Sequence, residues 1–320
     1  MKIAPFWIVS ILLFAAGVYF AATVENQYYF FAGYTILQAT LIATAWNILG
    51  GFTGYVNFGS AGFFGLGAYT SVALHTAFEP PLIVMIVTAA VICGLLGLGT
   101  GYLTLRLKGV YFAIATLALA IVLETLMINW DYVGGSTGAY IITPERVLFF
   151  PTYIGYLFAL MLALTIGAVA IARYLNSSRV GRGLAAIRDD ETAAECAGVP
   201  TLKLKLLSTT IMGALMGVAG APLPFFITFV EPVSAFNLLV AVNAIAMPMI
   251  GGTASWIGPI VGAVLLGSVQ EWAKVTIPSE WNILIVGVVL VGFITLAPRG
   301  IVGLVQSLRQ KARANGPATA

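Results

Sequence analysis

The sequence predicts an all-α fold, a polytopic membrane bundle of about ten transmembrane helices, some of them discontinuous. Hydrophobic residues make up 60% of the 320 residues and charged residues only 8%, and the mean hydropathy is +1.00. A helix needs about 20 apolar residues to cross a hydrocarbon core of about 30 Å, and several charge-free runs reach that length. These runs are continuously apolar, whereas the strands of a membrane β-barrel alternate in polarity.

The charge-free runs define the expected crossings. The first run is too long for the apolar region of a secretory signal, so we expect it to form the first membrane helix. Two runs, 26–78 and 232–270, are too long for one crossing and must fold back. In chain order, we expect crossings near residues 5–24, 29–49, 55–77, 81–105, 109–130, 151–173, 206–230, 236–250, 256–272 and 281–298.

Basic residues predict the orientation of the bundle, because they concentrate on the cytoplasmic side of membrane proteins. If both termini are cytoplasmic, every Lys and Arg except Arg146 and Lys274 lies on the inner side. The net charge of +3 is therefore a topology signal and not a nucleic-acid site. No linker separates folded units, so we expect one transmembrane domain over 1–320, with a cytoplasmic loop at 177–205 and a cytoplasmic tail at 299–320.

Two glycine-rich stretches suggest an internal repeat. "GFTGYVNFGSAGFFGLGAYT" begins at Gly51 and "GGTASWIGPIVGAVLLGSVQ" at Gly251, and the same shift aligns Gly62 with Gly262. Glycines that interrupt matching helices are typical of repeated transporters whose broken helices line the substrate path. Small residues equally serve to let helices pack closely, and the sequence leaves both interpretations open. The path candidates in the first stretch are Asn57, Ser60, Gly62 and Gly65.

The sequence lacks the residue patterns of common catalytic sites. No Gly-Lys dipeptide occurs, so the chain has no Walker A loop for ATP phosphates. The single histidine, His75, has no neighbour at metal-ligand spacing, and Cys93 and Cys196 are expected to be separated by the membrane interior. We therefore predict no catalytic residue, no metal ligand and no cofactor bound by this chain, which is not expected to be an enzyme.

Charges deep in the bilayer, which ion-driven carriers need, are scarce. Glu124 is the only charge within the expected crossing 109–130 and lies about two turns from its outer end. We add Glu124 and Asn129 to the path candidates. Neutral polar groups are more plentiful and either contact a substrate or bridge helices. They are Gln38, Asn47, Asn57, Ser60, Asn129 and Asn243.

The loop 177–205 is the one long, highly charged segment, and it contains helix signals. Arg188-Asp189-Asp190-Glu191 supplies a capping aspartate and an acidic first turn, and Gly198 and Pro200 supply the stop. A helix of two or three turns is not stable alone in water. It is therefore expected to dock on a partner, although a solvated loop helix without a partner also fits the composition.

Several stretches resemble one transporter family. The segment from "GRGLAAIRDDETAAECAGV" to "KLKLLSTTIMGALMGVAGA" resembles the cytoplasmic coupling loop of ATP-binding-cassette importer permeases, most closely the branched-chain amino acid permeases. "WNILGGFTGYVNFGSAGFFGLGAYT", "LKGVYFAIATLALA", "GGSTGA", "GGTASWIGPIVGAVL" and "PRGIVG" match further parts in order. The resemblance covers most of residues 46–303 and is closest to the second permease subunit of such importers.

The resemblance implies an inner-membrane importer subunit without its own ATP site. The implied partners are a second, homologous permease, two cytoplasmic ATPase subunits that use the ATP, an extracytoplasmic substrate-binding protein and membrane lipid. Branched-chain or other small neutral amino acids are the expected substrates; urea or short amides, which the family also carries, an ion-coupled carrier and a membrane scaffold are the alternatives. The residues that match the coupling loop are Arg182, Arg188, Asp189, Glu191, Glu195 and Gly198.

Overall fold

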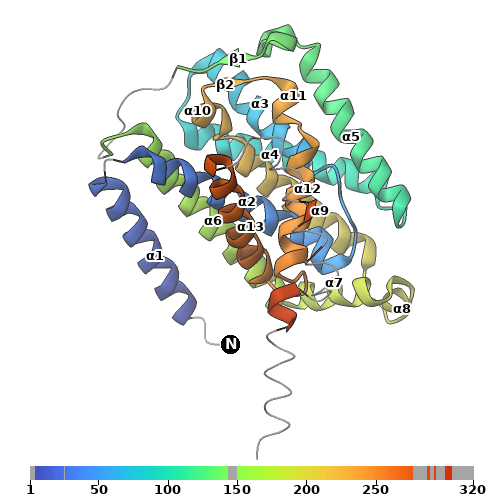
Figure 1. The fold of residues 1–320 in the computed structure, drawn as a ribbon. Helices are drawn as coiled ribbons and strands as arrows, with labels where there is room; N and C mark the ends of the chain where they lie inside the picture. Colours follow the sequence, from blue (N-terminus) through green and yellow to red (C-terminus); the bar gives the residue numbers. More distant parts are fainter. Residues whose placement is uncertain are drawn as a thin grey trace, which may run out of the picture.

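The computed structural model describes residues 4–24, 26–142, 150–276, 287–288, 292 and 300–304, and this part is mostly helical (Figure 1). Its long helices are α1 (Ala4–Thr23), α2 (Gln27–Thr53), α3 (Ser60–Phe78), α4 (Leu82–Thr104), α5 (Val110–Ile128), α6 (Tyr153–Ser177), α9 (Thr201–Gly220), α12 (Leu238–Gly251) and α13 (Gly258–Thr276). The shorter elements are η1 (Asp131–Val133), η2 (Gly135–Thr137), β1 (Ala139–Tyr140), α7 (Arg179–Asp189), α8 (Glu191–Cys196), α10 (Leu223–Ile227), β2 (Phe229–Val230) and α11 (Pro232–Ala235).

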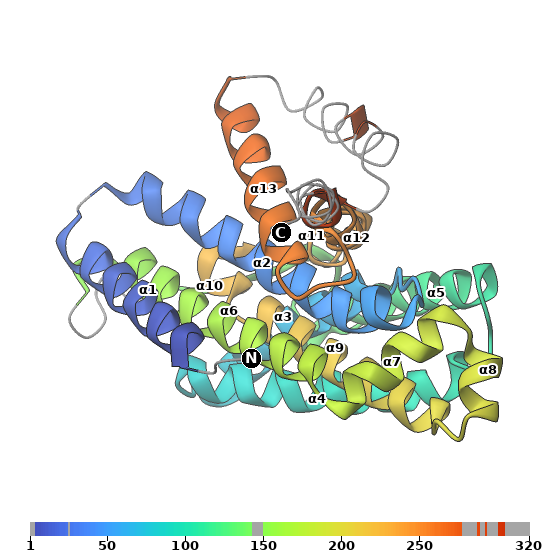
Figure 2. The same cartoon turned by 90° about the horizontal axis from the view of Figure 1, so that it is seen from below.

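Helix α2 lies in the interior of the bundle. It packs against α6, α9 and the pair formed by α12 and α13, and most of its residues from Gln38 onward are buried. Figure 2 shows α1 on one flank beside α6, and α5 on the opposite flank. Glycines allow α4 and α9 to approach closely: a Cβ at Gly97 would lie 2.7 Å from the Thr209 carbonyl oxygen.

Seven segments of the described chain are long and apolar enough to cross a membrane. Large hydrophobic side chains of α1, α4 and α5 are exposed on the outside of the bundle, as expected for surfaces that contact lipid rather than water. The seven segments are Phe6–Thr23, Gln27–Thr53, Leu82–Thr104, Val110–Ile128, Tyr153–Ser177, Thr201–Ile227 and Pro232–Gly251.

Within the described residues, fewer segments meet this criterion than the ten crossings that the sequence predicts. Two further helices, α3 and α13, contain 19 residues each but are less apolar, because glycine and hydroxyl residues interrupt both helices and two charged residues interrupt α13. The expected crossing at 281–298 lies outside the described residues, apart from three positions. The structure thus confirms a multi-pass helical bundle, and ten crossings are not confirmed.

The internal repeat is not confirmed either. The aligned glycines make different contacts: Gly62 faces Ala120 of α5, whereas Gly262 faces the backbone of Met247 in the neighbouring helix α12. In the second stretch, Gly251 and Gly258 also pack backbone against backbone where α12 meets α13. These contacts fit the close-packing interpretation of the second stretch.

A small sheet closes one end of the bundle. β1 and β2 pair antiparallel, with Ala139 opposite Val230 and Tyr140 opposite Phe229. Gly138 precedes β1 with φ +78°, and a Cβ there would lie 2.6 Å from the Val230 carbonyl oxygen, so the position requires glycine. The sequence does not predict these strands, because two residues are too few for a visible alternation.

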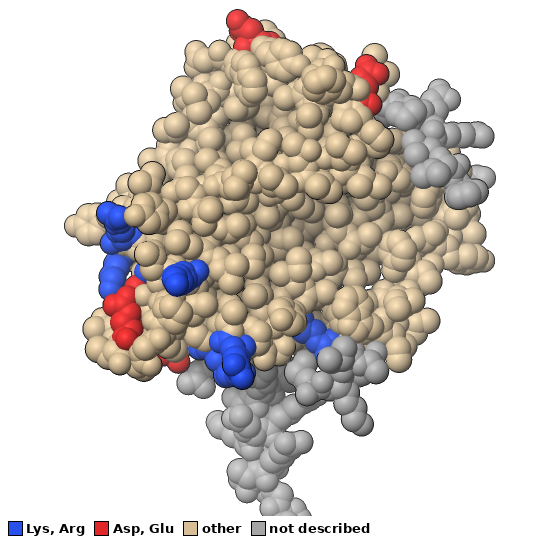
Figure 3. All heavy atoms as spheres, turned by 180° about the vertical axis from the view of Figure 1, so that it is seen from behind, with Lys and Arg blue, Asp and Glu red and all other residues tan. Residues whose placement is uncertain are grey.

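Basic side chains gather at the other end, where α7 and α8 lie (Figure 3). Lys108 and Lys205 meet Glu191 of α8 there, and the guanidinium of Arg173 lies 4.2 Å from the ring centroid of Phe6, near the start of α1. The bundle is therefore electrically asymmetric along the direction in which its long helices run. The other described basic residues at this end are Arg106, Arg179, Arg182, Arg188 and Lys203.

Candidate functional site

Two helices and the turn after them form the charged loop. Ser178 caps α7 by accepting a hydrogen bond from the Gly181 backbone N–H at 3.2 Å, and Asp190 caps α8 by accepting from Thr192 and Ala193 at 2.9 and 3.0 Å. Helix α8 ends at Cys196, and Gly198 takes φ +81°. The predicted start and stop of the short helix are confirmed.

Helix α7 was not predicted from the sequence. It contains 11 residues and buries Gly181, Leu184 and Ile187. The serine cap and the spacing of Val180, Leu184 and Ile187 on one helix face are the signals that could have found it. Because α7 is anchored by this apolar face, it holds the neighbouring helix α8 at the basic end of the bundle.

Five of the six predicted coupling residues, all except Glu191, have exposed side chains or backbone. Arg188 pairs with Asp189 at 3.3 Å, and Glu195 accepts a hydrogen bond from Thr201 at 2.6 Å. Arg182 and Gly198 line a groove of about 470 Å³ between α7 and the turn that follows α8. These groups are available to another protein.

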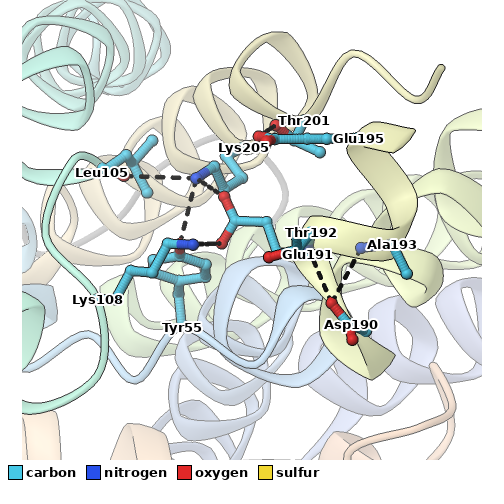
Figure 4. Close-up of polar contacts among 10 residues, drawn as sticks. All are labelled: Tyr55, Leu105, Lys108, Asp190, Glu191, Thr192, Ala193, Glu195, Thr201 and Lys205. Carbon is cyan, nitrogen blue, oxygen red and sulfur yellow. Dashed lines mark hydrogen bonds and ion pairs between the residues drawn. The ribbon is translucent and has the colours of Figure 1, made fainter. Parts of the chain in front are cut away.

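Glu191 points the other way, into the protein (Figure 4). One carboxylate oxygen lies 2.6 Å from the Lys205 ammonium nitrogen, and the other accepts a hydrogen bond from the Tyr55 hydroxyl at 2.7 Å and lies 3.6 Å from the Lys108 ammonium nitrogen. Lys205 also donates to the Leu105 carbonyl at 3.4 Å and to the Tyr55 hydroxyl at 3.2 Å. The Lys205 side chain is only 4% exposed.

The environment of Glu191 lowers the pKa of its carboxyl below the ordinary value of 4.5. Burial by itself raises this pKa, but the hydrogen bonds from Lys205 and Tyr55 and the charges of Lys205 and Lys108 outweigh it. The carboxylate is therefore ionised at neutral pH and pairs with the buried ammonium of Lys205. The sequence gives no sign of this network, because Tyr55 and Glu191 are 136 residues apart.

The path candidate Asn57 lies within a non-helical segment, 54–59, that separates α2 from α3, and the candidate Ser60 is the first residue of α3. The Asn57 side-chain oxygen accepts from the Gly59 backbone N–H at 2.7 Å, and its backbone carbonyl accepts from the Trp46 indole at 2.9 Å. The buried Ser60 hydroxyl has no hydrogen-bond partner within the described residues. The segment begins at Gly54, which takes φ +80°, and α3 after it is continuous from Ser60 to Phe78, so a break within this expected crossing is not confirmed.

Gly62 and Gly65 lie at helix contacts. A Cβ at Gly62 would lie 2.9 Å from the Ala120 Cα on α5, and one at Gly65 would lie 2.7 Å from the Phe236 ring. Both distances are shorter than real Cβ contacts, so each glycine allows a neighbouring element to approach. Their predicted place on a translocation path stays a prediction.

Glu124 lies on α5, and Asn129 lies at the end of that helix. The Glu124 side chain is partly exposed and makes no hydrogen bond or ion pair within the described ranges. The Asn129 side chain donates to the Thr125 carbonyl at 2.8 Å and so satisfies the end of its own helix. Within the described part of the chain, no hydrogen bond joins these two side chains to Asn57 or Ser60.

A cavity of about 640 Å³ lies between α2, α10, α12 and α13. Three amide side chains take part in its lining: Gln270 donates to Asn243 at 3.1 Å, and Gln38 donates to the Ala219 carbonyl at 2.9 Å. Gln38 and Asn243 are among the polar groups that the sequence singles out, and Gln270 is not. Within the described residues, no three His, Cys, Asp or Glu side chains come together as metal ligands would.

Comparison with known proteins gives consistent matches. The family model for the branched-chain amino acid transport system permease component matches residues 28–294. The high-affinity branched-chain amino acid transport system permease protein LivM of Salmonella typhimurium is 26% identical over 280 residues, which cover 80% of this chain and 65% of the relative. The corresponding protein LivH of the same organism is 26% identical over 180 residues, which cover 55% of this chain and 54% of the relative.

A relative with another printed function also matches. The autoinducer 2 import system permease protein LsrC of Yersinia enterocolitica is 25% identical over 228 residues, covering 68% of this chain and 62% of the relative. The chain spans less than two thirds of the length of these relatives. No solved structure matches it significantly.

Proposed function

The chain belongs to the branched-chain amino acid transport permease family, and from this premise we propose that it is the permease subunit of an ATP-binding-cassette importer. In this proposal it moves branched-chain or other small neutral amino acids across the inner membrane. Separate ATPase subunits bind and hydrolyse the ATP, so the chain itself needs no cofactor. The names of the relatives LivM and LivH support this substrate class.

The charged loop is the observation on which the proposal rests. Helices α7 and α8 form a folded unit at one end of a membrane bundle, and five of its predicted coupling residues are exposed. A short helix that is packed on the bundle and surrounded by exposed charges suits a surface to which a soluble partner protein binds. We propose that ATPase subunits bind here, and that their closure moves the bundle as a rigid body.

We propose that this end is cytoplasmic, in agreement with the positive-inside rule. Both termini would then be cytoplasmic, with ten crossings that include 281–298. The complete importer would contain a second, homologous permease, two ATPase subunits and an extracytoplasmic binding protein. The amide-lined cavity of about 640 Å³ between α2 and the α12–α13 pair is large enough for a small amino acid and suits the path in such an assembly.

The first experiment is gentle extraction of the tagged chain from its native membrane, followed by mass spectrometry of the proteins that remain bound. We expect recovery of two ATPase subunits and a second permease. A matched sample with Asp189→Lys and Arg188→Glu should lose the ATPases and keep the second permease, because these residues are exposed at the proposed docking surface. Recovery of the wild-type chain alone would contradict the proposal.

The substrate is decided separately, with the binding protein recovered from the same source. Leucine, valine, alanine, urea, acetamide and autoinducer 2 are each tested for binding by calorimetry. Binding of leucine or valine supports the proposed class, whereas binding of urea, acetamide or autoinducer 2 replaces it. Uptake by the chain in vesicles without ATPases, abolished by Glu124→Gln, would instead indicate an ion-coupled carrier.

A further inference from the structure

Helix α8 has few apolar contacts to hold it on the membrane bundle. It contains six residues, and Ala194 is the one that is buried. A helix of this length does not persist alone, and the burial of one alanine adds little apolar stabilisation. Helix α7 and the hydrogen bond from Thr201 to Glu195 hold α8 in part, and the side chain of Glu191 adds contacts with three other segments.

Each of these contacts joins α8 to a different part of the bundle. Lys205 belongs to α9, Tyr55 to the segment 54–59, and Lys108 to the link between α4 and α5. The Lys205 ammonium is almost fully buried, and a buried charge that loses its partner is strongly destabilising. Lys205 therefore stays with the Glu191 carboxylate when α8 is displaced.

Tyr55 extends the connection toward the interior. Its hydroxyl contacts both Glu191 and Lys205, and its ring packs edge-on against Phe112 at 5.1 Å. Two residues later, Asn57 is fixed by the Trp46 indole, and the segment leads directly into α3. A movement of the Tyr55 side chain is therefore passed along a short, hydrogen-bonded stretch to the start of α3.

We propose that Tyr55 and Lys205 are positioning residues that transmit movement of α8 to the broken segment 54–59 and the start of α3. This inference rests on the proposed function, in which ATPase subunits move α8. The contacts that transmit the movement are the ion pair between Glu191 and Lys205 and the two hydrogen bonds of the Tyr55 hydroxyl. These contacts stay formed when α8 is displaced. The exposed coupling residues receive the movement, and the inward network transmits it.

The experiment measures the attachment of α8 to the segment 54–59 in the purified full chain. Spin labels are placed on the native Cys196 of α8 and on Val56→Cys, both of which are exposed, in a Cys93→Ala background. The distance distribution between the labels should be narrow in this parent protein. Lys205→Met should broaden it, whereas Lys203→Met, which removes an exposed charge from the same helix, should leave it narrow.

A second substitution, smaller than Lys205→Met, tests the same link with less risk that the protein fails to fold. Tyr55→Phe removes one hydroxyl and keeps the ring on Phe112, and Tyr111→Phe is its control because Tyr111 is exposed. We expect Tyr55→Phe to broaden the distribution and Tyr111→Phe to leave it unchanged. Equal distributions in Tyr55→Phe and its control would overturn the inference, whatever Lys205→Met does.

The second readout is the amount of radiolabelled leucine imported per ATP hydrolysed in the complete importer. Mutations along such a connection change coupling by about 2- to 30-fold, and we expect a loss in that range for Tyr55→Phe and Lys205→Met but not for Lys203→Met. An unchanged ratio in both network variants would overturn the transmitting role. If no ATPase assembles with the wild-type chain, the proposed function fails, and the label distances still decide whether the link exists.

Discussion

At the scale of single residues, the direction of a side chain separates groups that the sequence treats as equivalent. Glu191 and Arg188 both occur in the charged loop, and the resemblance assigns both to coupling. The structure places Arg188 on the surface and directs Glu191 toward the buried Lys205. Reversing both charges together would therefore not be harmless to the fold, because a positive residue at 191 would face an unpaired buried ammonium. Sequence pattern alone could not reveal this, since the partners Tyr55 and Lys205 come from other elements.

The lowered pKa of Glu191 predicts how the attachment of α8 responds to pH. A carboxyl whose pKa is lowered in the folded state stabilises that state above its ordinary pKa, and the contribution is lost as the pH falls through the lowered value. The groups that face the carboxylate are Lys205, Lys108 and the Tyr55 hydroxyl. The distance distribution between labels at Cys196 and Val56→Cys should stay narrow at neutral pH and broaden only below the ordinary value of 4.5. Glu191→Gln should be broad throughout, and broadening of the parent protein near pH 6 would contradict the prediction.

At the scale of elements, the apolar runs were sufficient to predict the long helices, because length and continuity suffice for a membrane span. Their interruptions were harder to place. The helix expected from residue 55 begins at Ser60, because Gly54 takes a left-handed conformation and Asn57 holds the following turn. The short strands and α7 were missed, since their signals are too few residues to stand out in one sequence.

The contact between α3 and α5 gives a test of the two interpretations of Gly62. A methyl group there would meet the Ala120 backbone, so Gly62→Ala should destabilise the bundle by about 1–3 kcal/mol and lower its thermal midpoint in detergent. Gly99→Ala on α4 is the matched control, because nothing lies within 4 Å of its Cβ position, and alanine should stabilise that helix by about 0.5–1 kcal/mol. If Gly62→Ala keeps its thermal midpoint but blocks transport, a path role is supported instead.

At the scale of the whole molecule, the distribution of charge is more informative than the number of crossings. The basic side chains lie at the end of the molecule where α7 and α8 lie (Figure 3), and the β1–β2 sheet lies at the other end (Figure 1). The sequence predicted the clustering of basic residues correctly, because the order of the loops between the apolar runs is enough to place those residues on one side of the bundle. It could not show that the polar residues that lower the hydropathy of α3 are buried inside the bundle and not exposed to lipid.

This asymmetry predicts how the protein sits in the membrane. Cys196 is exposed on α8, so a membrane-impermeant maleimide should label it in inside-out vesicles and not in right-side-out vesicles if α8 is cytoplasmic. Tyr140→Cys in a Cys196→Ser background should show the opposite pattern, because Tyr140 is exposed on β1 at the other end. The buried Cys93 should stay unlabelled in both preparations and serves as the internal control. Labelling of Cys196 only in right-side-out vesicles would invert the topology, and the ATPase-docking role of α7 and α8 would then fail with it, because ATP is supplied from the cytoplasm.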